Sequence, residues 1–385
     1  MPVKLRAALL LPALLVGCAT TPGTPPAAGL FADYLFAAPS ERVSPADVFA
    51  LSDDMKRYLA EDVAFRPGGT ADRRALLDAL YSKGELKLEY ESTRTRNAAL
   101  AFADRAGNCL SLVIMTAAFA KAMDVPVRFQ RLAADETVTR SGDIHFFVGH
   151  VNVSLGFRPA ENGLDRGRGD EMTVDFLPPQ LTRGLHMQPV REETVIAMYM
   201  NNRAAEALAR GQIDDAYWWA RAAVVADPRF GSGHNTLGVI YQRHGNLAEA
   251  EATLAFALDR EPRNTHVMSN LVGVLAARGR TDESAALARR LAQLEPIPAF
   301  QLFDRGRKAY DEGDNAAARD LFAKEVERAP HYHEFRYWLA AAYARLGDAE
   351  SARRELALAM EYSATHRERD LYAAKLDRLR SGVPH

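Results

Sequence analysis

The chain contains 385 residues, a length typical of two or three domains. Its 48 Lys and Arg residues against 50 Asp and Glu give a net charge of −2, which excludes the strongly basic surface expected of a nucleic-acid-binding protein. With only two cysteines, the chain is neither a disulfide-rich scaffold nor a cysteine-based zinc module.

The N-terminus has the features of a bacterial export signal. Lys4 and Arg6 precede an apolar run of about a dozen residues, too short to span a bilayer as a helix. The sequence Leu15–Cys18 (LVGC) resembles the lipobox, in which cleavage leaves a diacylated N-terminal cysteine. We therefore expect residues 1–17 to be a lipoprotein signal peptide and Cys18 to be lipidated. The alternative is a secretory signal that merely contains a cysteine.

The residues after Cys18 predict a location and a tether. Ala19 stands where an Asp would favour retention in the inner membrane, so the resemblance implies the periplasmic side of the outer membrane. Residues 19–29 are rich in Thr, Pro and Ala, and we expect residues 18–42 to form a lipidated, flexible tether.

Several helices and an extended segment are predicted before Cys109. Ser44 and Pro45 are typical of an N-cap and a first helical residue. The predicted elements are a helix from Ser44 to about Val63, a helix over 71–83, an extended piece over 86–90 and a helix over 96–106.

Cys109 lies at the predicted start of a buried helix. Residues 110–123 are apolar nearly all round, and Gly107-Asn108 before them is a turn and cap signal. At a helix start, unpaired N–H groups and the helix dipole favour a thiolate, and the dipole alone contributes roughly 0.3–1 kcal/mol. Cys109 is therefore a candidate nucleophile. The alternative is a small buried hydrophobic residue.

Strands are predicted after this helix. They cover residues 125–132, residues 143–155 with a bend at Gly149, and residues 173–176, with a polar hairpin loop over 157–171. Alternation places His150, Asn152 and Ser154 on one face of the second strand. Asp175 is an acid among apolar neighbours, so it needs a partner, and a His on the adjacent strand would be one.

A cysteine at a helix start, followed by His and Asp on consecutive antiparallel strands, resembles the transglutaminase-like superfamily of papain-like cysteine enzymes. The similarity covers about residues 85–180, from Thr93-Arg94-Thr95 through GNCLSL and HVNV to VDF. The resemblance implies an α+β domain over residues 43–190, with helices and a small antiparallel sheet.

The resemblance also implies acyl transfer. His150 would deprotonate Cys109 and later protonate the leaving amine, while Asp175 would orient the imidazole. The N–H of Cys109 is the expected oxyanion donor. Hydrolysis by a protease or amidase is favoured over cross-linking to an amine, because water is the default acceptor.

Two further residues bear on this site. His145 is a rival base, but in an unbroken strand it would face away from His150, and it follows a loop-like segment. Asn152 is a candidate hydrogen-bonding partner behind His150. No cofactor is implied, and His331 and His333 have no further ligand candidates nearby, so no metal is expected.

The second half has a 34-residue period. Glycines recur at positions 211, 245, 279, 313 and 347, and prolines at 228, 262, 296 and 330. This pattern resembles tetratricopeptide repeats, each a pair of antiparallel helices, and predicts an all-α solenoid. We expect five repeats over residues 197–366, then a C-terminal capping helix and tail over residues 367–385. The combination most resembles a bacterial subgroup that joins a transglutaminase-like domain to such repeats.

The repeats favour a groove for a protein or peptide partner over a mere spacer or dimerisation face. Trp218 and Trp219 are adjacent on the second helix of repeat one and cannot both face its core. One of them is therefore expected to pack outward, on the preceding domain or as an exposed binding residue.

Two functions compete. The first is a lipid-anchored periplasmic cysteine enzyme whose repeats present a protein substrate. The second is a non-catalytic adaptor or assembly lipoprotein, in which the repeats bind a partner and the enzyme-like domain is a scaffold. The complete set of Cys109, His150 and Asp175 favours the first, and the sequence predicts neither the substrate nor the oligomeric state.

Overall fold

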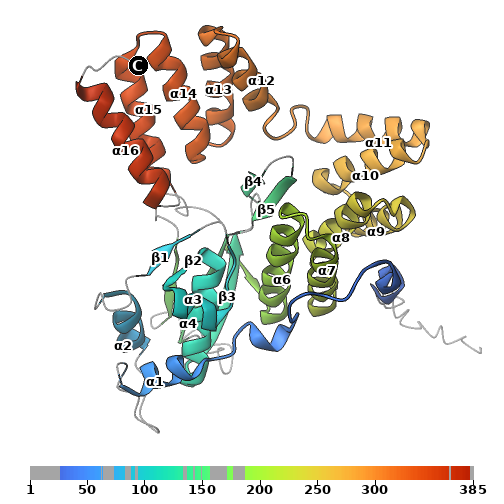
Figure 1. Cartoon of the computed structure of the whole chain (residues 1–385), viewed down its shortest axis with the longest axis vertical. Coiled ribbons are helices and arrows are strands. Elements are labelled where there is room, and N and C mark those ends of the chain that lie inside the picture. The colour runs from blue at the N-terminus through green and yellow to red at the C-terminus, as the bar shows by residue number, and fades with distance from the viewer. Residues whose placement is uncertain are drawn as a thin grey trace, which may run out of the picture.

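The computed structural model describes residues 27–61, 63, 73–82, 88–91, 94–132, 137–141, 144–148, 150–156, 171–176, 187–363 and 366–381. The predicted signal peptide, Cys18 and the predicted loop over 157–170 lie outside these residues. Within the described parts, no helix combines the length and apolar character needed to cross a bilayer. The chain forms an N-terminal strap (residues 27–44), an N-terminal unit (residues 45–190) and a helical array (residues 192–381) (Figure 1).

The strap packs on the array and is not the flexible tether predicted for residues 27–42. It contains the short 3-10 helices η1 (Ala27–Leu30) and η2 (Asp33–Leu35), and lies against helices α7 (Ile213–Ala226) and α8 (Gly231–His244). The ring of Phe36 stacks on Tyr217 at 3.9 Å between centroids, and the N–H of Ala32 donates to the Tyr241 hydroxyl at 2.9 Å. Apolar burial and paired polar groups fix this segment.

The helices of the N-terminal unit largely follow the sequence expectation, with one correction. The helix predicted from Ser44 to Val63 is two elements, because Ser52 Oγ accepts the N–H of Met55 at 3.2 Å and starts a new helix. The elements are η3 (Pro45–Asp47), α1 (Asp53–Glu61), α2 (Arg73–Leu77) with the π-helical turn η4 (Asp78–Ser82), α3 (Ala98–Asp104) and α4 (Cys109–Ala122).

The largest described sheet has four antiparallel strands in the order β7-β6-β3-β8. These are β3 (Val127–Leu132), β6 (Val151–Leu155), β7 (Met172–Val174) and β8 (Met187–Val190). Two small pairs accompany it: parallel β1 (Glu89–Tyr90) with β2 (Ala106–Gly107), and antiparallel β4 (Thr137–Ser141) with β5 (Ile144–Val148).

The single strand predicted over residues 143–155 is wrong. Residues 144–148 pair with the preceding strand β4 as a separate hairpin, whereas residues 151–155 pair with β3 and β7 in the four-stranded sheet. The change of partner falls between Val148 and Val151, so the chain there passes from one sheet to another; Gly149, where a bend was predicted, lies outside the described residues.

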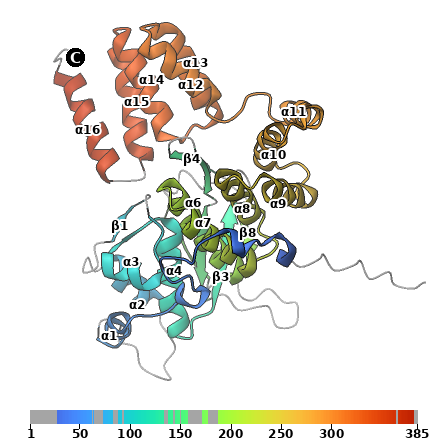
Figure 2. The same cartoon turned by 45° about the vertical axis from the view of Figure 1, so that its right-hand side comes forward.

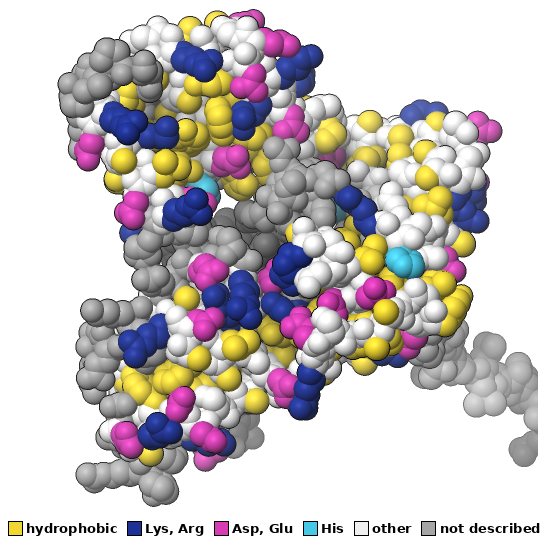
Figure 3. Space-filling model, in the orientation of Figure 1, with side chains coloured by type: hydrophobic (Ala, Val, Ile, Leu, Met, Phe, Trp, Pro, Cys, Tyr) yellow, Lys and Arg dark blue, Asp and Glu magenta, His cyan; other side chains and the backbone are white. Residues whose placement is uncertain are grey.

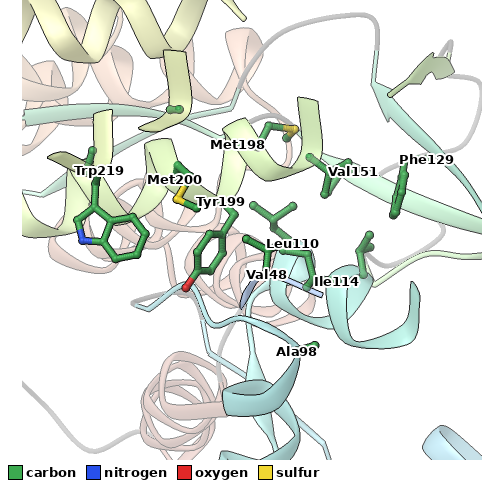
Figure 4. Packing of buried hydrophobic residues seen from close by; sticks show 14 of the residues in the cluster. Val48, Ala98, Leu110, Ile114, Phe129, Val151, Met198, Tyr199, Met200 and Trp219 are labelled. Carbon is green, nitrogen blue, oxygen red and sulfur yellow. The ribbon is translucent and has the colours of Figure 1, made fainter. Parts of the chain in front are cut away.

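Helix α4 is the centre of the core. Its residues from Cys109 to Ala120 are all buried, as the apolar sequence predicts. Leu110 and Ile114 belong to one cluster with Val151 of β6 and Tyr199 of α6 (Glu192–Ala209), the first helix of the array (Figure 4). Burying one such aliphatic side chain contributes about 1.5–3 kcal/mol. The N-terminal unit and the array are therefore joined by a shared apolar core.

The array contains the five predicted helix pairs and the predicted capping helix. The periodic glycines lie between the two helices of each pair; Gly245, for example, ends α8 with a φ of 91°, a backbone conformation that L side chains rarely adopt. The remaining helices are α9 (Leu247–Arg260), α10 (Thr265–Ala277), α11 (Thr281–Leu294), α12 (Gln301–Asp311), α13 (Asn315–Arg328), α14 (His333–Arg345), α15 (Ala349–Tyr362) and α16 (His366–Ser381).

The array is not one continuous stack. Buried side chains of α6 to α10 belong to the same cluster as the N-terminal unit, whereas α12 to α14 and α14 to α16 form two clusters of their own. Figures 1 and 2 show an extended connection between α11 and α12. On the face shown in Figure 3, Lys and Arg side chains are interspersed with Asp and Glu, in line with the near-neutral net charge.

Candidate functional site

Cys109 is the first residue of α4, as the turn before it predicts. Asn108 is the N-cap, and its Oδ1 accepts the N–H of Ser111 at 2.9 Å. The side chain of Cys109 is buried, with 5% exposure. Cys109 therefore lies at the N-terminal end of α4. The first N–H groups of a helix have no partner within it, and together with the helix dipole they stabilise negative charge there.

His150 and Asp175 lie side by side on neighbouring strands. His150 directly precedes β6 and Asp175 directly follows β7, and the antiparallel register pairs Val153 with Val174. The Nε2 atom of His150 lies 2.8 Å from Oδ1 and 3.0 Å from Oδ2 of Asp175. The sheet thus brings together the two residues that the sequence singled out as partners.

Nδ1 of His150 is buried and has no hydrogen-bond partner among the described residues. Burial opposes protonation of His150, but hydrogen bonds and charge interactions with Asp175 and Cys109 outweigh it and raise the pKa of His150 to about 9. Because Nε2 faces Asp175, Nδ1 is the ring nitrogen available to the thiol.

Asn152 lies beside this pair. Its Nδ2 donates to Asp175 Oδ2 at 3.3 Å, and its side chain is buried. Next along the same face, the hydroxyls of Ser154 and Thr173 are 2.8 Å apart and tie β6 to β7. Asn152 thus shares the hydrogen-bond partner of His150.

His145 is separated from His150 by the change of sheet. It lies on β5, opposite Arg140 of β4, whereas His150 leads into the four-stranded sheet. The argument that the two residues face opposite sides of one strand therefore does not apply. The side chain of His145 lies outside the described parts of the molecule.

The described residues contain no group of three or more His, Cys, Asp or Glu side chains placed to hold a metal ion. Nδ1 of His333 lies 2.9 Å from the hydroxyl of Tyr372 on the capping helix, so this His has a structural partner.

A polar cluster next to the turn that precedes Cys109, here called the cysteine turn (residues 107–109), was not predicted from the sequence. The N–H of Arg96 donates to Ser111 Oγ at 2.8 Å, and the buried Arg96 side chain pairs with Glu91 and Asp104, at 2.6 Å in each case. The N–H of Thr95 donates to Glu206 of α6 at 2.6 Å. The segment around Thr95 was part of the family resemblance, but nothing in its pattern indicated which helix would meet it.

Trp218 and Trp219 both contact the strap. Nε1 of Trp219 donates to Glu41 at 2.9 Å, and Nε1 of Trp218 donates to the carbonyl of Ala37 at 2.6 Å. The sequence predicts that one of them packs on the preceding domain or is an exposed binding residue; both instead contact the strap, within the segment predicted to be a tether.

Comparisons with known proteins concern the array. Residues 235–296 and 309–375 match models of the tetratricopeptide repeat, so the repeats predicted from the 34-residue period are confirmed there. The chain is 32% identical over 160 residues to the cellulose synthase operon protein C of Xanthomonas axonopodis pv. citri (strain 306), which covers 39% of this chain and 10% of that protein. The chain thus spans about a tenth of the length of this relative.

Among solved structures, YrrB, described as a repeat protein with an unusual peptide-binding site, is 21% identical and covers 46% of this chain and 92% of its own, with a TM-score of 0.26. The pilF protein of Pseudomonas aeruginosa is 19% identical, covering 50% of this chain and 87% of its own, with a TM-score of 0.28.

Proposed function

We propose that the chain binds a protein or peptide partner through its tetratricopeptide repeats and carries a cysteine-dependent acyl-transfer site in its N-terminal unit. The repeat matches support the binding function directly, because such repeats generally take protein segments. The enzymatic part rests on one arrangement: Asp175 pairs with Nε2 of His150, the other ring nitrogen, Nδ1, is buried with no hydrogen-bond partner among the described residues, and Cys109 begins the neighbouring helix α4.

The proposed mechanism uses these three side chains in turn. The Cys109 thiolate attacks an amide carbonyl carbon, and the protonated His150 gives its proton to the leaving nitrogen as the C–N bond breaks. The product is a thioester on Cys109 and a free amine. Water, deprotonated by His150, then releases a carboxylic acid; an amine in its place would form a new amide. Asp175 keeps the imidazole oriented and stabilises its cation.

The oxyanion donor in this proposal is the backbone N–H of Cys109. The first N–H groups of a helix have no partner within it, and Asn108 Oδ1 is already used by Ser111. No acceptor for the N–H of Cys109 lies among the described residues. In this proposal the N-terminal unit has the transglutaminase-like fold that its sequence resembles.

Thiol alkylation tests the enzymatic part. We expect iodoacetamide to modify Cys109 rapidly near pH 6, about 2.5 pH units below the ordinary thiol pKa, and His150→Ala to remove this reactivity. Peptide mapping by mass spectrometry measures the alkylation of Cys109 separately from that of any other thiol. Equal rates in the two proteins would refute an activated cysteine.

The second candidate is a non-catalytic adaptor. It is favoured by the comparisons, which bear on the repeats, and by the burial of Cys109 and His150, with 5% and 6% exposure. Capture of partners from native envelopes with wild type and Cys109→Ala distinguishes the two. An adaptor retains the same partners at the same level, whereas an inactivated enzyme accumulates its substrate.

We further propose that the protein is anchored through a lipid on Cys18, on the periplasmic side of the outer membrane, as its N-terminal sequence suggests. Metabolic labelling with palmitate, followed by membrane fractionation, tests this. Label in wild type and its loss in Cys18→Ala are expected; an unlabelled wild-type protein would contradict the anchor.

A further inference from the structure

A chain of hydrogen bonds leads from the first repeat to the cysteine turn. The Nδ2 of Asn108 donates to the Thr95 hydroxyl at 2.9 Å, and Asn108 is the N-cap residue directly before Cys109. The backbone N–H of the same Thr95 donates to Glu206 Oε1 at 2.6 Å, so Thr95 bridges Glu206 and Asn108. Glu206 belongs to α6, the first helix of the array.

These groups are shielded from water. Thr95 is 2% exposed, and Asn108 and Ser111 are also buried. A buried polar atom that loses its partner cannot turn to solvent, so removal of one member leaves its neighbour unsatisfied. The orientation of the Asn108 amide, with Oδ1 on Ser111 and Nδ2 on Thr95, therefore depends on the whole chain.

Glu206 is itself held in place. Arg203, one turn earlier on α6, pairs with Glu206 at 3.0 Å and with Glu41 of the strap at 2.8 Å. Glu41 also accepts from Trp219 Nε1 on α7. The carboxylate that meets Thr95 is thus fixed by the array and the strap together.

We propose that Glu206 is a positioning residue for Cys109, so that the first repeat is a structural part of the acyl-transfer site. This inference rests on the proposed function. Through Thr95 and Asn108, Glu206 sets the geometry of the first turn of α4 and hence the place of the thiol relative to His150. An N-terminal unit separated from α6 would lack this support.

The same helix provides a matched control. Glu192, in the first turn of α6, pairs at 2.6 Å with Lys121 in the last turn of α4. Both side chains are about 40% exposed. Glu192 and Glu206 thus join the same helix to the N-terminal unit, but only Glu206 reaches the cysteine turn.

The experiment measures the rate of Cys109 alkylation by iodoacetamide against pH in the full chain. We expect Glu206→Ala to lower the rate near pH 6 by about tenfold or more and to move the pH profile of alkylation to higher pH. Glu206→Gln, whose amide oxygen can still accept the Thr95 N–H, should recover most of the rate. Glu192→Ala should stay within about twofold of wild type.

Thr95→Val is the second variant. It keeps the backbone bond to Glu206 and removes only the hydroxyl that accepts from Asn108 Nδ2. It should shift the pH profile in the same direction, with a wild-type circular dichroism spectrum. A wild-type profile in Thr95→Val or in Glu206→Ala overturns the inference. If His150→Ala leaves the wild-type profile unchanged, the proposed function itself fails; if His150→Ala shifts it and Thr95→Val does not, this inference alone fails.

Discussion

The first and last parts of the array look alike in sequence but differ in what they pack against. Helices α6 to α10 share one hydrophobic cluster with α4, the helix that begins with Cys109, whereas α12 to α16 are held by clusters of their own. Contacts of the first part span long distances in the chain: the bond between Ala32 and Tyr241 joins residues 209 apart. A shared repeat pattern therefore does not mean a shared role.

This difference suggests a division of labour. The first repeats pack on the unit that carries Cys109, whereas the last repeats share no hydrophobic cluster with it among the described residues. Substitutions in the last repeats should therefore leave the cysteine site unchanged, whereas substitutions in the first repeats should affect it.

The largest effect is expected from Cys109→Ser, which keeps the shape of the side chain but replaces the nucleophile. Loss of a catalytic nucleophile costs up to about 10⁶-fold in rate in well-studied triads. Release of amine from envelope-derived peptides, followed by mass spectrometry, measures this activity. A substitution in the last repeats, such as Gly306→Ala, should leave the activity of the same preparation within about twofold.

Asp175→Asn comes next. The amide keeps the shape but cannot stabilise the imidazolium, and the equivalent change in a known triad lowers kcat by about 10⁴-fold. The rate of Cys109 alkylation near pH 6 should fall as well. An unchanged rate would show that His150 acts without Asp175.

Stability should depend on pH through His150. Its pKa is raised from 6.5 to about 9 in the folded protein, so its contribution is fully present below about pH 6.5 and is lost as the pH rises through 9. A shift of this size corresponds to about 3 kcal/mol. Urea unfolding of the full chain, followed by far-UV circular dichroism from pH 6 to 9.5, should show this decline. In His150→Ala the decline should be much smaller, and an equal decline would assign it to other groups.

Two glycines at corresponding positions, one in the first part of the array and one in the last, allow the two parts to be compared directly. A Cβ at Gly238 of α8 would lie 2.6 Å from Leu254 Cγ, and one at Gly306 of α12 would lie 2.7 Å from Phe322 Cε1. Overpacking of this kind typically costs about 1–3 kcal/mol. Gly238→Ala should raise hydrogen exchange in α4, whereas Gly306→Ala should raise it in α13 and leave α4 unchanged. Equal effects on α4 would show that the array behaves as one cooperative unit.

Regular features were predictable because their physical causes are local. The 34-residue spacing of glycines located the helix pairs, and the apolar run after Asn108 located α4 and placed Cys109 at its start. The pairing of His150 with Asp175 was anticipated because an acid among apolar residues needs a partner.

Features that depend on distant contacts were not predictable. The Thr- and Pro-rich composition near the N-terminus suggested a tether, but Phe36 and Asp33 meet Tyr217, far along the chain. Likewise, nothing near Thr95 or Glu206 reveals that they meet, and the separation of β5 from β6 depends on which strand each one finds. Such pairings are decided by the folded chain as a whole.

The central claim is that Cys109 forms an acyl-enzyme. The most direct measurement is intact mass spectrometry of the full chain after incubation with envelope-derived peptides and an acid quench. We predict an added mass on Cys109 that hydroxylamine removes, as it cleaves a thioester, and that is absent from Cys109→Ser. Wild-type protein with no such adduct, under conditions in which the repeats still capture a partner, would contradict the claim and leave the adaptor function.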